Sequence, residues 1–142
     1  MFKVRLLPAA LLALALYVTS PTFAQKTLDL PFGPLGESGG SAVATITVID
    51  DTVTLFVTAS GLQPGTRYEV QTHAGNCEFP SASFGALGTL DTDEQGNASL
   101  TTTTARMSAA GVTIDLAILV DGLHTLDIRG PEALACVSIP AV

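Results

Sequence analysis

Residues 42–61 read AVATITVIDDTVTLFVTASG, and hydrophobic side chains recur there at every second position. The repeat covers two groups of hydrophobic residues: Ala44, Ile46 and Val48, then Val53, Leu55, Val57 and Ala59. A period of two is that of a half-buried β-strand. Asp50 and Asp51 stand between the two groups and predict a tight turn, so the stretch predicts a β-hairpin.

Working outward from this hairpin, the chain continues as short strand-like runs separated by turns. Two short strands are expected within residues 85–104, around an acidic turn that contains glycine, whereas residues 78–86 look irregular. Further strands are expected at residues 67–73, 112–120, 124–130 and 133–140. Threonine, valine and isoleucine are abundant in these runs, as strands prefer. Seven or eight such strands predict an all-β sandwich or barrel with antiparallel pairing.

The amino-terminal region is typical of a secretory signal peptide. Lys3 and Arg5 precede an apolar run, and small residues at Thr22 and Ala24 predict cleavage before Gln25. The alternative is an uncleaved anchor. We expect an exported protein, periplasmic or extracellular, and the sequence contains no later run long enough for a membrane span.

After removal of residues 1–24, two segments follow. Residues 25–41 contain two prolines and four glycines and are interpreted as a flexible N-terminal arm. Residues 42–142 are expected to form one domain. Four basic residues remain in this chain (Lys26, Arg67, Arg106, Arg129) against thirteen acidic ones, which gives a net charge of −9. Such a charge argues against binding to nucleic acid and to anionic membrane surfaces.

The chain contains two cysteines, Cys77 and Cys136. In an exported protein such a pair most often forms one disulfide. Two free thiols or a metal-binding pair are the alternatives, although two cysteines 59 positions apart give no metal-ligand spacing.

Few residues have side chains suited to catalysis. No motif of a hydrolase or a phosphate-binding loop is present. His73 follows the polar residues Arg67, Glu69 and Gln71 at even spacing, so we expect it on the polar, solvent-exposed face of its strand. Asp121 and His124 are weak candidates to hold a metal together with His73, but nothing in the sequence brings the three together.

Asp91 and Asp93 are weak candidate calcium ligands. With Gly96 they resemble the beginning of a calcium-binding loop, but Thr102 stands where a bidentate acid is required. The segment is better interpreted as a hairpin turn in which Gly96 supplies a positive φ.

The order of several motifs resembles the copper/zinc superoxide dismutase family. GLQPGTRYEVQTHAGNC (61–77) is similar to that family's strand G-L-x-P-G-x-H-G-F-H-x-H-E-x-G-x-C. LGTL (87–90) with the turn after it, AILVD (117–121) and LACVSI (134–139) resemble its H-x-G-D-L, A-I-V-V-H and L-A-C-G-V-I segments. The resemblance implies a Greek-key, immunoglobulin-like β-sandwich and a disulfide between Cys77 and Cys136.

The ligands of that family's metals are not kept at the matching positions. The copper-binding histidines fall on Val70, Thr72 and Asp121, and the zinc-binding residues fall on Ala86 and Thr89. Arg129 is the only nearby candidate for the catalytic arginine.

We therefore expect a non-catalytic, exported domain without a cofactor and with a structural or binding role. Its partner is an unspecified protein or small ligand, and a homodimer is compatible with the sequence. The alternatives are a dismutase with a reduced or unusual copper/zinc site and a calcium-stabilised extracellular module.

Overall fold

The structure is a computed structural model that describes residues 25–35, 39–49, 52–78, 80–103, 107–109, 112–114, 119–131 and 134–141. The predicted signal peptide, residues 1–24, lies outside the described residues, as does the Asp50–Asp51 turn. Within the described part of the chain, no helix is long and apolar enough to cross a membrane.

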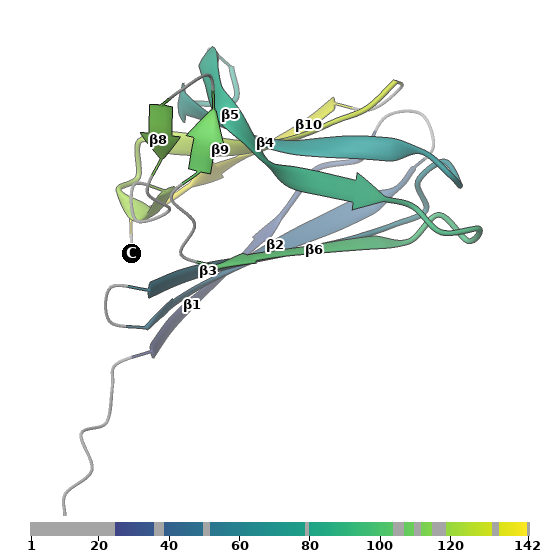
Figure 1. Cartoon of the computed structure of the whole chain (residues 1–142), viewed down its shortest axis with the longest axis horizontal. Helices are drawn as coiled ribbons and strands as arrows, with labels where there is room; N and C mark the ends of the chain where they lie inside the picture. The colour runs from purple at the N-terminus through teal and green to yellow at the C-terminus, as the bar shows by residue number, and fades with distance from the viewer. Residues whose placement is uncertain are drawn as a thin grey trace, which may run out of the picture.

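The described residues form two four-stranded antiparallel sheets that face each other (Figure 1). The first sheet has the order β1-β2-β3-β6, with bounds Gln25–Pro31, Ser41–Ile49, Thr52–Ser60 and Ala98–Thr103. The second has the order β10-β9-β4-β5, with bounds Leu134–Ile139, His124–Arg129, Arg67–Gly75 and Pro80–Asp91. A separate hairpin joins β7 (Met107–Ala109) to β8 (Val112–Ile114). The expected all-β sandwich is confirmed.

The core lies between the inward faces of the two sheets. The four alternating residues of β3 are all buried, as the sequence predicts: Val53, Leu55, Val57 and Ala59. The second sheet contributes Tyr68 and Val70 from β4 and Leu126 and Ile128 from β9. Alternate residues of a strand point to opposite faces, so each sheet buries one face and turns the other outward.

The prediction of a flexible arm at residues 25–41 is wrong for its first part. Residues 25–31 form β1, which pairs along its whole length with β2. Leu30 and Phe32 are buried in the core, so this part of the segment has the alternation of a strand, and the glycines all lie after β1. Because the N–H of Phe32 donates to the carbonyl of Ala42, the nitrogen of Pro31 faces the free edge of the sheet, where proline is tolerated.

Residues 80–86 were also expected to be irregular, yet they belong to the twelve-residue strand β5. The pairing of β5 with β4 shifts register three times, after Val70, Thr72 and His73. Bulges of this kind keep the strands paired while disturbing the alternation of the sequence, which is why the segment did not look like a strand.

The prediction of a single strand at residues 112–120 is wrong as well. Only Val112–Ile114 forms a strand, β8, while Leu119 and Val120 form a short 3₁₀ turn and residues 115–118 are not described. Leu119 is fully buried in this turn. Leu119 is an odd position, opposite to the even-numbered apolar positions of the predicted strand, so the turn buries a residue that the alternation did not place inward.

Candidate functional site

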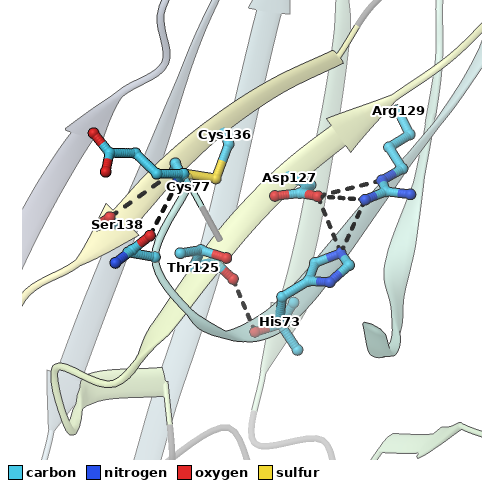
Figure 2. Close-up of a disulfide and its surroundings, with 10 residues drawn as sticks. His73, Cys77, Thr125, Asp127, Arg129, Cys136 and Ser138 are labelled. Carbon is cyan, nitrogen blue, oxygen red and sulfur yellow. Dashed lines mark hydrogen bonds and ion pairs between the residues drawn. A yellow bond between two sulfur atoms is a disulfide. The ribbon is translucent and has the colours of Figure 1, made fainter. Parts of the chain in front are cut away.

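The disulfide between Cys77 and Cys136 determines what covers the outward face of the second sheet. Their sulfur atoms are 2.11 Å apart and their Cα atoms 5.7 Å apart. Cys77 follows β4, whereas Cys136 lies in β10, and β9 stands between these two strands. The chain after β4 must therefore cross the outward face of β9 to reach Cys136, and it encloses the side chains beneath it (Figure 2).

His73 lies beneath this crossing. It is on the outward face of β4, as strand parity predicts, but its side chain is only 3% exposed, so the expectation of a surface histidine is wrong. Its Nδ1 lies 2.8 Å from the carbonyl oxygen of Ser81, at the beginning of β5. The alternation along a strand shows on which face of the sheet a side chain lies. Whether that side chain is exposed to solvent depends on other segments that cover the face.

Asp127 is the centre of the polar cluster around His73. It lies on the outward face of β9 and is 1% exposed. Its Oδ2 lies 3.0 Å from Nε2 of His73 and accepts hydrogen bonds from Arg129, at 3.0 Å from Nη2 and 3.2 Å from Nε (Figure 2). Arg129 is 44% exposed at its side chain, so it closes the cluster on the solvent side.

Both nitrogens of the His73 ring lie close to oxygen acceptors. Nδ1 faces a carbonyl oxygen and Nε2 faces a carboxylate oxygen, and neither of these oxygens can donate a hydrogen bond. Nη2 of Arg129 lies 3.4 Å from Nε2 and competes for the same carboxylate oxygen. The cluster thus holds the Asp127 carboxylate between the His73 ring and the guanidinium of Arg129, and pairing with the guanidinium stabilises the buried charge.

Among the described residues of this face, two buried side-chain oxygens have no hydrogen-bond partner. They are Oδ1 of Asp127 and Oγ1 of Thr125, from two outward positions of β9. Figure 2 shows the Asp127 carboxylate between the disulfide on one side and His73 with Arg129 on the other. Cys136 is the cross-strand partner of Asp127, so the disulfide stands directly beside the carboxylate.

This geometry supports a structural role for the cluster rather than catalysis. A histidine that acts as general base needs a ring nitrogen within reach of a nucleophile or a substrate. Both nitrogens of His73 are already engaged, and the ring is shielded from solvent.

The positions matched to metal ligands point in different directions. Val70 and Thr72 are fully buried on the core side of β4, and the Thr72 hydroxyl donates to the carbonyl of Thr125 at 3.0 Å. Ala86 and Thr89 are exposed in β5. A core-facing valine and a threonine already engaged by a carbonyl offer no pair of metal ligands.

The structure brings Asp121 and His124 together but not His73. Nδ1 of His124 lies 2.8 Å from Oδ1 of Asp121. His124 occupies an inward position of β9, next to Ala74 in the pairing, whereas His73 faces outward. Among the described residues, no group of three or more His, Cys, Asp or Glu side chains is placed to hold a metal.

Asp121 makes stability depend on pH. The hydrogen bond from His124, aided by the N–H of Leu123, lowers the pKa of Asp121 below its ordinary value of 3.8. A lowered folded-state pKa means that the stabilisation is present above 3.8 and is lost as pH falls through the folded-state value. We expect denaturant unfolding to show a steeper loss of stability below this pH for the natural chain than for Asp121→Asn. Equal slopes for the two proteins would contradict the assignment.

The carboxylates of Asp91 and Asp93 are engaged with other groups. Asp91 pairs with Arg67 at 2.6 Å, on the surface. Oδ1 of Asp93 accepts the N–H groups of Asn97 at 2.8 Å and Gln95 at 2.9 Å, and these bonds, that of Asn97 most, lower the pKa of Asp93. Gly96 has a φ of 78°, as a hairpin turn of this kind requires. The contacts are those of a self-contained turn.

Sequence reasoning missed Asp127 and Thr125 as members of the cluster. The sequence contained no distinctive signal, because Thr125 and Asp127 alternate with Leu126 and Ile128 as in any half-buried strand. An outward aspartate is ordinary until another segment covers it.

Comparison of the sequence with models of known protein families gives no match. Comparison with curated proteins also finds no similar sequence.

Proposed function

We propose that this protein is an exported, non-catalytic domain of the copper/zinc superoxide dismutase type, with a structural or binding role. The observation that carries the proposal is the burial of Val70 and Thr72 on the core side of β4. These are the positions where the resembled family has imidazoles. The strand thus keeps its place in the sheet, while the side chains of Val70 and Thr72 pack in the hydrophobic core.

The order of the strands supports the fold part of this proposal. The path around the sandwich is β1, β2, β3, β6, β5, β4, β9, β10, with β5 contacting β6 and β1 contacting β10. The chain leaves the first sheet after β3, forms the β4–β5 hairpin and returns as β6 beside β3. A return of this kind is consistent with a Greek key in an immunoglobulin-like sandwich.

Export is supported by two independent features. The amino-terminal segment has the pattern of a signal peptide, and the Cys77–Cys136 disulfide is compatible with an oxidising compartment. A periplasmic and an extracellular location fit these features equally well.

The histidines favour a non-catalytic role over a dismutase with an unusual metal site. Copper redox sites use several imidazoles in fixed geometry. The only histidines of the chain are His73 and His124. They occupy opposite faces of the second sheet, and each has a ring nitrogen beside a carboxylate. A resemblance in fold does not by itself imply an enzymatic activity, because activity depends on the residues of the active site.

Metal content and superoxide consumption of the exported protein test this proposal. The full chain is expressed in an exporting host, incubated with copper and zinc, and passed through a desalting column. We expect less than one bound metal per chain and no superoxide consumption above that of a heat-denatured sample. Stoichiometric copper with cyanide-sensitive activity, both lost in His73→Gln but kept in His124→Gln, would instead establish a reduced dismutase site.

A further inference from the structure

The outward side of the β1-β2-β3-β6 sheet is a surface of unusual composition, here called the neutral face. In Figure 1 no coloured element lies on this side of the sheet. Among its described residues Asp29 is the one charged side chain at an outward strand position. Its carboxylate accepts the hydroxyl hydrogen of Thr45 at 2.7 Å. The face is therefore almost uncharged although the exported chain carries a net charge of −9 (four basic minus thirteen acidic residues).

Threonines form a continuous row across this face. The strand register places Thr27 opposite Thr47, Thr47 opposite Thr54, and Thr54 opposite Thr103, so the row spans all four strands. Each hydroxyl both donates and accepts a hydrogen bond. A row of this kind can bond to an identical row, which makes the face complementary to itself, as a two-fold interface requires.

Exposed hydrophobic residues lie on the same face. Val43, Ile49 and Phe56 are 39%, 40% and 41% exposed. Val43 pairs with Thr58 and Phe56 pairs with Thr45, so Val43 and Phe56 are diagonal neighbours across β2 and β3. An aromatic side chain beside an aliphatic one is the composition typical of an interface centre.

The size of the neutral face is sufficient for a stable interface. The nine residues of β2 and of β3 extend over about 30 Å, and four strands span about 19 Å. The projected area of the sheet is on the order of 500 Å². Because side chains protrude from the sheet, the accessible surface area is larger and approaches the roughly 800 Å² per partner of a standard interface.

We propose that the neutral face binds a second copy of this chain, sheet against sheet, about a two-fold axis. The inference deepens the proposed binding role and rests on it, because it names the partner of that role. Two acidic copies repel each other over most of their surfaces, and this face is where they approach with the least repulsion. Phe56 and Val43 form the apolar centre, and the threonine row supplies the hydrogen bonds around it.

Sedimentation equilibrium of the full chain, purified after export, tests the proposal. We expect a monomer–dimer equilibrium. Phe56→Glu places two like charges at the centre and should weaken the dimer by about tenfold or more. Phe56→Thr keeps a residue suited to an exposed strand and should weaken it less. Thr89→Glu, at an exposed position of β5 in the other sheet, is the matched control and should leave the equilibrium unchanged.

Salt distinguishes this interface from one held by charge pairs. Screening reduces the repulsion between two acidic copies, so dimerisation should strengthen from low to moderate ionic strength. Melting curves of the variants establish that each is folded.

A monomer at all concentrations, or a dimer that Phe56→Glu leaves intact, would overturn the proposal. Metal content and superoxide consumption, measured on the same samples, report separately on the non-catalytic function, so the two proposals can fail independently.

Discussion

Replacing Cys77 and Cys136 together by serine is expected to lower the free energy of unfolding by about 4 kcal/mol, because the disulfide closes a long loop in the unfolded chain. The two cysteines are 59 positions apart. The bond also holds the segment that covers His73 and Asp127, so its loss should expose both side chains. Denaturant unfolding of the oxidised natural protein and of the double variant gives the difference in stability.

The natural protein treated with a dithiol reductant is the control for this prediction. It should unfold at the same denaturant concentration as the double variant, since both lack the cross-link. Amide hydrogen exchange should increase in residues 76–85 and on β9, and remain slow in β2 and β3. A double variant within about 1 kcal/mol of the oxidised protein would mean that the covering segment is held by other contacts.

The second large effect is expected at Asp127. Asp127→Ala removes the shared acceptor of His73 and Arg129, and breaking a buried ion pair from one side costs about 3 kcal/mol or more. His73, at 3% exposure, then loses the carboxylate beside Nε2 and retains the Ser81 carbonyl and Nη2 of Arg129 as neighbours of its ring. Arg129 reaches solvent, which limits the loss. Denaturant unfolding measures the change.

Matched variants separate charge from shape at this position. Asp29→Ala removes an exposed carboxylate from an edge strand and should cost well under 1 kcal/mol. Asp127→Asn keeps the shape and one acceptor oxygen and should fall between the two alanine variants. A double-mutant cycle of Asp127→Ala with His73→Ala should show strong coupling between the two residues. Additive effects would indicate that the contact does not contribute to stability.

Both predictions concern a cluster that sequence reasoning identified only in part. The residues of β4 alternate clearly, and this placed Val70 and Thr72 inward and His73 outward, as found. Burial of His73 could not be inferred, because it depends on a segment that returns from β4 across β9 to reach β10. The partner of His73 was equally hidden, since Asp127 is 54 positions later and becomes adjacent only through the pairing of β4 with β9.

Other elements differ in how strongly a local pattern constrains them. The β2–β3 hairpin follows from local alternation, because two amphipathic segments joined by a short turn bury their apolar faces together. β1 was missed because residues 25–41 as a whole are rich in proline and glycine, although β1 itself contains only Pro31. Pairing with β2 and burial of Leu30 and Phe32 make it a strand. The first part of β5, residues 80–86, was missed because bulges in its pairing with β4 break the period of two.

The sequence by itself determined the β class, the inward face of the central strands and the acidic surface, because these properties follow from residue type and short-range periodicity. Tertiary structure alone decided that His73 is buried and paired with Asp127, that Asp121 meets His124 on the other face, and that four threonines align in one row. Each of these depends on which strands are neighbours and in which register, and long-range pairing is a property of the whole chain that no local pattern specifies.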